Sequence, residues 1–325
     1  MISKLLSNLD RYKPPTENCC FGRSTSADAG IQYWYQAIKT INLQKSLLSS
    51  GNIAIVGYQC EEGIRRNLGR IGAKEGADAA RKQLAKLAYH HSRKNILDVG
   101  NVVCDDTNLE STQQNLSDII SQLVSHNIFS IVIGGGHDVA YGHFKGLQQG
   151  LNLKENSKIG IINFDAHFDL RPVGKAGNSG TPFSQILEEH GDRVKYLALG
   201  IQQQSNTKEL FNNADRLGVK HLFNYDCEVS NIKAIFSTID TFQAEVDHLY
   251  VTIDMDGFSS AYAPGVSAPS PMGFTPFFVF KTLEYLFKTK KVVGLDIAEL
   301  SPKYDLDNAT ARLAARLLDF AVGKV

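Results

Sequence analysis

Two short motifs place carboxylates and an imidazole at the ends of apolar runs. NFDAHFDL carries Asp165, His167 and Asp169 directly after the apolar run KIGII. VTIDMDG carries Asp254 and Asp256, two residues apart. Carboxylate and imidazole groups are ligands of divalent cations such as Mn²⁺. Side chains of these types at this spacing are therefore candidates for a metal site.

A third motif, IVIGGGHD, adds a second imidazole, His137, just past another apolar run. Four carboxylates in one crevice would repel one another and raise each other's pKa values, whereas two divalent cations would neutralise them. The set exceeds the three protein ligands and one water of a catalytic zinc site, and oxygen-rich ligation with imidazole suits Mn²⁺. Two such ions can hold a bridging hydroxide, because each lowers the pKa of bound water. The predicted metal ligands are His137, Asp165, His167, Asp169, Asp254 and Asp256.

Each motif taken alone also has an ordinary structural explanation. An aspartate at a strand end, such as Asp138, often caps a helix or a turn, and three glycines can simply form a turn. The glycines are not a phosphate-binding loop, because no Gly-Lys-Ser/Thr follows, and no G-x-S-x-G nucleophile motif is present. Three such motifs at successive strand ends favour a metal site over three separate structural roles.

The elements that must position these residues follow from the apolar pattern. Short apolar runs alternate with longer amphipathic segments, which predicts a mainly parallel sheet covered by helices on both faces. Ligands bind at the carboxyl ends of the strands in such sheets, and the three motifs lie there. We predict strands at 52–57, 96–103, 129–134, 159–165, 194–200, 220–223, 248–254 and 292–297, and helices near 75–91, 111–126, 138–149, 205–217, 230–246, 275–289 and 307–321.

Reach constrains the backbone within NFDAHFD. In a fully extended strand, the Cα atoms of Asp165 and Asp169 would lie about 13 Å apart, which is too far for one compact site. The strand is therefore expected to end near Ala166 and the chain to curl. Asp254 and Asp256 are only one such step apart and can flank one centre directly.

Composition narrows the class of protein. The chain has 325 residues, 43% of them hydrophobic, and equal numbers (34 each) of basic and acidic residues. The zero formal charge argues against nucleic-acid binding. The five cysteines form no CxxC pair, and neither a signal peptide nor an apolar stretch of about 18 residues is present, so we expect a cytoplasmic protein without a membrane span. We predict one domain, 1–325, with residues 1–50 as an extension anchored by Trp34.

The order GGGHD, NFDAHFD, TIDMDG resembles the arginase/agmatinase ureohydrolases from about residue 52 to the C-terminus. The resemblance implies a three-layer α/β/α fold with a mostly parallel eight-stranded sheet and two Mn²⁺ ions per subunit. It implies that Asp165 and Asp254 bridge the ions, with His137 and Asp169 completing one site and His167 and Asp256 the other. Glu299, in DIAELSP, matches the glutamate that pairs with a cationic guanidinium or amidinium. The resemblance also implies that the chain can form a homo-oligomer.

Within that family, the chain departs from the arginases. It has GGGHD in place of GGDHS, lacks the third aspartate of D-x-D-x-x-D-P, and has no histidine after NSG. GGGH, NFDAHFDLR, SGTPF, APGVSAPSP and EEGIRRNLGRIGA instead resemble the formimidoylglutamase subgroup of histidine degradation. This implies hydrolysis of N-formimidoyl-L-glutamate to L-glutamate and formamide. Glu299 would hold the amidinium, and Asp256 or a metal-bound water would carry the proton.

The two carboxylates of that substrate require cationic or hydroxyl partners. Arg171, two residues after Asp169, is well placed because a guanidinium suits a carboxylate bidentately, although a surface arginine in a loop ion pair is the ordinary alternative. Ser179 and Thr181 in NSGTPF are weaker candidates, because Ser-Gly-Thr also makes a common turn. A further contact is expected among Arg65, Arg66 and Arg70.

Three competing interpretations stay open at this point. Another ureohydrolase, an agmatinase or a guanidino-acid hydrolase, would release urea. A metal-binding homologue without activity would turn over no amidine or guanidine. A deacetylase-like relative would bind one zinc with fewer ligands, so a metal content near two per chain would exclude it.

Overall fold

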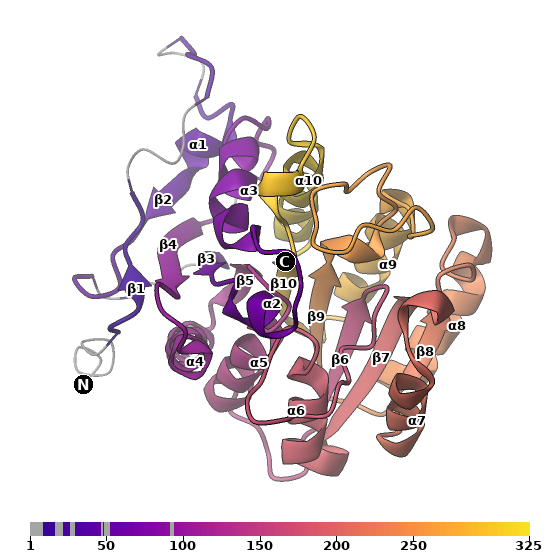
Figure 1. Ribbon diagram of the computed structural model, residues 1–325. Helices are drawn as coiled ribbons and strands as arrows, with labels where there is room; N and C mark the ends of the chain where they lie inside the picture. The colour runs from indigo at the N-terminus through magenta and orange to yellow at the C-terminus, as the bar shows by residue number, and fades with distance from the viewer. Residues whose placement is uncertain (1–8, 17–21, 27–29, 47, 49–52, 92–93) are drawn as a thin grey trace.

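The computed structural model describes residues 9–16, 22–26, 30–46, 48, 53–91 and 94–325. Within these residues, the centre of the molecule is one ten-stranded sheet in the order β1-β4-β3-β5-β10-β9-β6-β7-β8, with β2 also paired to β4 (Figure 1). All pairs are parallel except β1 with β4. The strands are β1 (Tyr12–Lys13), β2 (Ile38–Thr40), β3 (Ile53–Gln59), β4 (Ile96–Val103), β5 (Phe129–Ile133), β6 (Ile159–Phe164), β7 (Val194–Ile201), β8 (Lys220–Phe223), β9 (His248–Asp254) and β10 (Val292–Ala298).

Helices cover both faces of the sheet, so the fold has the expected three layers (Figure 1). Alternate residues of β5 enter different cores: Ile131 and Ile133 pack with α3, α8, α9 and α10, whereas Val132 packs with α4, α5, α6 and α7. This two-sided burial explains why the strands are continuous apolar runs. The helices are α1 (Trp34–Ala37), α2 (Glu62–Arg66), α3 (Gly76–Leu84), α4 (Leu109–Ser125), α5 (Val139–Gly150), α6 (Pro182–His190), α7 (Lys208–Arg216), α8 (Ile232–Gln243), α9 (Pro276–Lys288) and α10 (Ala309–Lys324).

The eight expected strands correspond to β3–β10. Three have the expected ends and the ends of the others differ by at most two residues, while residue 52, the expected start of the first, lies outside the described residues. The two further strands, β1 and β2, lie in the N-terminal segment and are three residues long or shorter. They pair with β4 through their backbones and carry no apolar pattern that the sequence could display. Helices α1, α2 and α6, of four, five and nine residues, are not among the predicted helices.

Trp34 joins the N-terminal segment to the rest of the molecule. Its side chain is 1% exposed and belongs to the core that contains α10. The indole Nε1 donates to Asp319 Oδ1 at 2.8 Å, and the ring meets Tyr89 edge to face. These contacts give Trp34 the anchoring position that the sequence predicts for it. The single-domain organisation remains a prediction.

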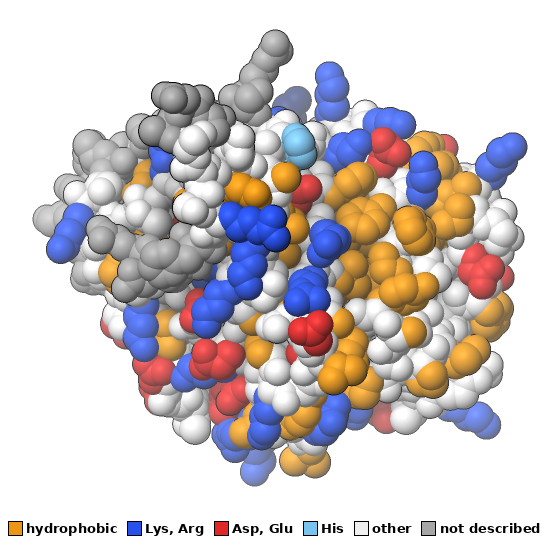
Figure 2. All heavy atoms as spheres, turned by 90° about the horizontal axis from the view of Figure 1, so that it is seen from above, with side chains coloured by type: hydrophobic (Ala, Val, Ile, Leu, Met, Phe, Trp, Pro, Cys, Tyr) orange, Lys and Arg blue, Asp and Glu red, His pale blue; other side chains and the backbone are white. Residues whose placement is uncertain are grey.

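Figure 2 shows the molecule turned by 90° about the horizontal axis of Figure 1, so that it is seen from above. Hydrophobic side chains gather on the side where α8 and α9 lie, and lysines and arginines cross the middle of this face with acidic residues beside them. Met272 and Phe277, near the start of α9, are 69% and 71% exposed. Of the helices in the described part of the chain, none has the length and apolar character needed to cross a membrane.

Candidate metal centre

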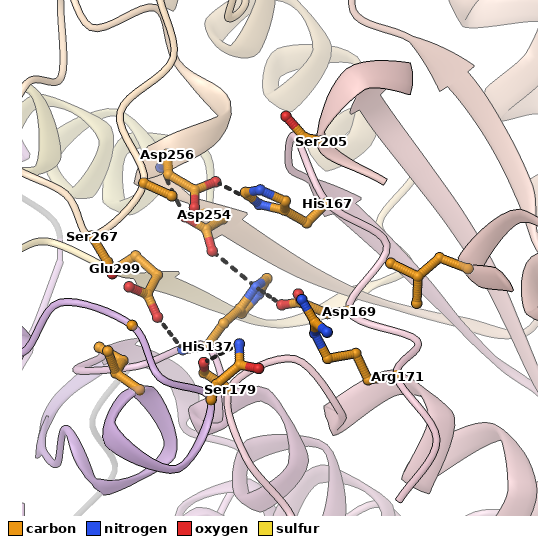
Figure 3. Close-up of a pocket in the computed structure, with 15 residues that line it drawn as sticks. His137, His167, Asp169, Arg171, Ser179, Ser205, Asp254, Asp256, Ser267 and Glu299 are labelled. Atoms are coloured by element: carbon orange, nitrogen blue, oxygen red, sulfur yellow. Dashed lines mark hydrogen bonds and ion pairs between the residues drawn. The ribbon is translucent and has the colours of Figure 1, made fainter. Parts of the chain in front are cut away.

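The predicted ligands come from strands that are neighbours in the middle of the sheet. The order β5-β10-β9-β6 is parallel throughout, so the carboxyl ends of these four strands lie side by side. His137 follows β5, Glu299 follows β10, and Asp254 ends β9. Strand β6 ends at Phe164, so the chain leaves the extended conformation directly before Asp165, as the reach argument requires. Figure 3 shows His137, Asp254 and Glu299 converging on one cavity.

The structure groups the six residues into two ligand sets. The first ligand set is His137, Asp165, Asp169 and Asp254, and the second ligand set is Asp165, His167 and Asp256. Within each set the ligand atoms all lie within 4.8 Å of one another. Asp165 belongs to both, with Oδ2 3.1 Å from His137 Nδ1 and Oδ1 3.4 Å from His167 Nδ1.

A carboxylate oxygen of Asp254 lies within 4.8 Å of all the other ligand atoms only in the first ligand set. Its Oδ2 lies 3.1 Å from His137 Nδ1, whereas its Oδ1 accepts a hydrogen bond of 2.8 Å from the backbone N–H of Asp256. The bridging role of Asp165 thus has matching geometry. The bridging role of Asp254 remains a prediction.

Unusual backbone conformations aim two of the carboxylates. Asp169 and Glu299 have positive φ values of 48° and 64°. Residues other than glycine rarely adopt this backbone conformation. The turn at Asp169 brings its Oδ2 to 2.9 Å from His137 Nδ1. The turn at Glu299 lets Oε1 accept from the backbone N–H of His137 at 3.0 Å. Such local strain is typical of functional sites, where the surrounding structure enforces it.

A close approach between two loops fixes His137. A Cβ atom on Gly135 would lie 1.7 Å from the carbonyl oxygen of Cys60, so only glycine fits there. The backbone N–H of Gly136 donates to the same carbonyl at 3.1 Å. The neighbouring Asp138, at the start of α5, does not cap the helix with its side chain but accepts from the Tyr58 hydroxyl at 2.7 Å.

The buried charges of the cluster strongly perturb one another. Burial would lower the pKa of His137, but its contacts with Asp165, Asp169 and Asp254 outweigh burial and raise it well above the usual value. Burial also lowers the pKa of His167, and the charge of Asp256 and the contact with Asp165 again raise it well above normal. The neighbouring carboxylates thus oppose the effect of burial on the pKa of both imidazoles.

Burial and neighbouring charges raise the pKa values of three of the carboxyl groups. Burial followed by the charge of Asp165 raises the pKa of Asp169 to about 6. Burial and the charge of Asp254 raise the pKa values of Asp256 and Glu299 well above normal. Divalent cations would replace these bound protons as the counter-charge, because metal ligands must be deprotonated.

The atoms also have the separations that a cation requires. Metal–ligand bonds of about 2.1 Å put adjacent ligands of an octahedral ion about 3 Å apart. His137 Nδ1 lies 2.9–3.1 Å from oxygens of three aspartates, yet among the described residues it has no partner in hydrogen-bond geometry. Asp256 Oδ1 is likewise buried without a hydrogen bond and lies 3.3 Å from His167 Nδ1. The residues present therefore fit two divalent cations.

A cavity of about 180 Å³ opens above the ligands. Arg171, Ser179 and Glu299 line it, as the sequence predicts for a substrate site. Arg171 makes no side-chain hydrogen bond or ion pair with any residue in the part of the chain that the structure describes. Gly180 makes room for it, because a Cβ there would lie 2.9 Å from Arg171 Cδ. Three other polar residues of the lining were not predicted as substrate contacts from the sequence: Asn67, Ser205 and Ser267.

The other predicted arginines are occupied elsewhere. Arg65 and Arg66 both pair with Glu62, and Arg66 also pairs with Glu110. Arg70 donates to the carbonyl oxygens of residues 266 and 267, and its guanidinium lies over the ring of Tyr304. None of the three lines the cavity. We therefore do not propose these arginines as substrate contacts.

Thr181 also lies outside the cavity lining. It occupies the N-cap position of α6 and is fully buried. Its hydroxyl accepts from the backbone N–H of Asn178 at 2.9 Å and contacts Gln185 Oε1 at 2.9 Å. The turn uses this hydroxyl. A substrate contact of Thr181 stays a prediction, which the cavity lining does not support.

Comparisons with known proteins agree with this geometry. The sequence profile described as the Arginase family matches residues 51–322. A formimidoylglutamase of Clostridium tetani (strain Massachusetts / E88) is 41% identical over 315 residues, which cover 94% of this chain and 93% of that protein. The structure of formimidoylglutamase from Bacillus subtilis has a TM-score of 0.81 at 21% identity, covering 93% of this chain and 94% of that one, which shows a common fold. Trypanosoma cruzi formiminoglutamase with two Mn²⁺ ions has a TM-score of 0.74 at 26% identity, covering 84% of this chain and 92% of that one.

Proposed function

This chain belongs to the arginase family, and from that premise we propose that it hydrolyses N-formimidoyl-L-glutamate to L-glutamate and formamide in histidine degradation. The family and the formimidoylglutamase relatives support a hydrolase of C–N bonds in linear amidines. The observation that carries the choice of substrate is Arg171, whose guanidinium lies on the wall of the cavity above the ligand sets and pairs with none of the described residues. A cation there suits an anionic substrate and would repel the cationic chain end of agmatine.

Two Mn²⁺ ions, one at each ligand set, are the proposed cofactor, and the manganese of the Trypanosoma cruzi relative supports this choice. When bound, the pair would supply hydroxide at neutral pH for attack on the amidine carbon. The protein holds the ligands rigidly, because His137, Asp165 and Asp254 are at most 2% exposed. The ligand sets contain carboxylate and imidazole groups and no thiolate. Such ligands favour manganese over ions that prefer thiolates.

Glu299 is the proposed partner of the substrate amidinium. Its Oε1 is fixed by the backbone N–H of His137, and its buried Oε2 has no hydrogen-bond partner in the described part of the chain. A charge-assisted hydrogen bond from the amidinium to Oε2 would satisfy that oxygen and orient the amidine carbon. A bound cation also favours the ionised form of a neighbouring carboxylate.

The leaving glutamate nitrogen needs a proton when the C–N bond breaks. Asp256 lines the cavity, and its Oδ1 makes no hydrogen bond with the described residues. We propose Asp256 as the residue that carries this proton, with a water molecule as the competing carrier. Ser179, whose Oγ accepts from Asn67 Nδ2 at 3.2 Å, is the proposed hydroxyl contact of a substrate carboxylate.

Product identity tests the function directly. The protein loaded with Mn²⁺ and given N-formimidoyl-L-glutamate should release L-glutamate and formamide in equal amounts. Parallel assays with arginine, agmatine and guanidino acids should give no urea. Urea release would replace the proposal by another ureohydrolase activity. A protein that binds two Mn²⁺ ions but turns over none of these compounds would be an inactive metal-binding homologue. A cytoplasmic location also remains part of the proposal.

Replacing Arg171 with alanine should lower kcat/KM for N-formimidoyl-L-glutamate by about 10- to 100-fold. The lost interaction is a charge-assisted hydrogen bond to a carboxylate, worth about 1.5–3 kcal/mol. The matched control is Arg65→Ala, because Arg65 is 56% exposed, pairs with Glu62 and does not line the cavity. Steady-state kinetics should leave the Arg65 variant within about twofold of the parent. An unchanged kcat/KM in the Arg171 variant would remove this residue from the site.

A further inference from the structure

The second ring nitrogen of His137 enters a polar network below the metal ligands. His137 Nε2 lies 2.9 Å from Thr252 Oγ1. The Thr252 hydroxyl donates to Asp296 Oδ1 at 2.5 Å. Thr252 and Asp296 are paired in register on the adjacent strands β9 and β10, and both are completely buried. The sequence draws attention to Asp296 as an ionisable residue in the last strand, but neither the ligand sets nor the cavity uses it.

Further contacts hold the Asp296 carboxylate in place. Its Oδ2 accepts a hydrogen bond from the Tyr250 hydroxyl and lies 2.7 Å from His143 Nδ1. The other nitrogen of His143 lies 2.9 Å from Ser130 Oγ. Ser130, His143 and Tyr250 are all completely buried. Both oxygens of Asp296 are thus held by side chains from α5 and β9, and Ser130 of β5 in turn holds His143.

The directions of these hydrogen bonds determine the tautomer of His137. The one proton of the Thr252 hydroxyl is donated to Asp296, so the hydroxyl faces His137 with a lone pair. His137 Nε2 must therefore carry hydrogen and donate to Thr252. In the neutral ring, the lone pair is then on Nδ1. Nδ1 is the atom that lies 2.9–3.1 Å from the three aspartates of the first ligand set.

We propose that Thr252 and Asp296 are positioning residues, which hold His137 in the tautomer and ring orientation that presents Nδ1 to the cation of the first ligand set. Outer hydrogen bonds of this kind fix the ring of a metal-binding histidine and raise its basicity. The proposal rests on the metal centre and not on the identity of the substrate. A protein that binds two Mn²⁺ ions but forms no formamide would contradict the proposed function and leave this proposal intact.

The test is a titration of the metal-free protein with Mn²⁺. The electron paramagnetic resonance signal of unbound Mn²⁺ measures how much of the ion is bound. The parent should bind two ions. Thr252→Val removes the hydroxyl at nearly constant volume and should weaken one ion by about 10- to 100-fold. The other ion should keep its affinity, because His137 is absent from the second ligand set. Thr252→Ser restores the hydroxyl and should restore two-ion binding.

Thr282→Val is the matched control. Thr282 is also completely buried, but its hydroxyl donates to the carbonyl oxygen of Phe278 within α9, away from the metal ligands. This variant should bind both ions like the parent. If Thr252→Val does not fold by circular dichroism, Asp296→Asn replaces it and should show the same loss at one ion. Equal weakening of both ions, or no weakening of either, would overturn the proposal.

Discussion

The Asp165→Asn variant should retain less than one Mn²⁺ per chain and lose at least about 1000-fold in kcat/KM, equivalent to about 4 kcal/mol. Asp165 is the residue shared by both ligand sets, with one oxygen directed at each histidine. Asparagine preserves the shape of the side chain but removes the negative charge and leaves only one good ligand oxygen. Metal analysis after gel filtration, followed by steady-state kinetics with added Mn²⁺, measures both effects.

Asp118→Asn is the control for loss of an aspartate charge. Asp118 lies on α4, where it accepts from Gln114 Nε2 at 2.7 Å, and it does not line the cavity. This variant should bind two ions and keep the kcat/KM of the parent. A full metal content in Asp165→Asn would contradict the assignment of Asp165 as the shared ligand.

Replacing Glu299 with glutamine should lower kcat/KM by about 100- to 1000-fold while both Mn²⁺ ions remain bound. Glu299 belongs to neither ligand set, and its Oε1 can still accept from the backbone N–H of His137 after the change. The variant loses only the charge that the amidinium would meet in a buried site, where an unpaired charge costs about 3–5 kcal/mol. Kinetics together with metal analysis separate this loss from a loss of metal.

A neutral isostere makes the Glu299 experiment specific. N-formyl-L-glutamate has the two carboxylates of the substrate but an uncharged amide in place of the amidinium. Its inhibition constant should change by no more than about threefold in Glu299→Gln, because only the charged group is expected to need the carboxylate. Glu110→Gln, at an acidic side chain 57% exposed that pairs with Arg66, should change neither quantity. Equal losses for substrate and isostere would mean that Glu299 does not recognise the amidinium.

The ligand residues could be predicted because each follows or ends a short apolar strand. A short apolar run and the polar residues that follow it can both be recognised from a few neighbouring residues. Ligand sites lie at the carboxyl ends of such strands in parallel sheets. The order β5-β10-β9-β6, by contrast, joins strands that are far apart along the chain. The sequence also did not show that Asp254, the N-cap of the short turn after β9, directs one oxygen to the backbone N–H of Asp256.

Other features depend on contacts that carry no local signal. Thr252 and Asp296 meet because two strands pair in one register, and nothing near either residue indicates the partner. Thr181 resembled a substrate contact because a Ser-Gly-Thr turn looks the same whether its hydroxyls face a ligand or the helix that follows. The arginines of EEGIRRNLGR could not be separated from Arg171 by sequence, since only the structure shows their partners.

The position of β10 has a consequence for folding. It is the last strand along the described part of the chain, yet it lies between β5 and β9. Without β10, the remaining strands would form two half-sheets with open edges, with His137 on one and the aspartates on the other. Unpaired edges of this kind are prone to aggregation during folding. The two halves of the proposed metal centre would therefore come together only when β10 pairs with both β5 and β9.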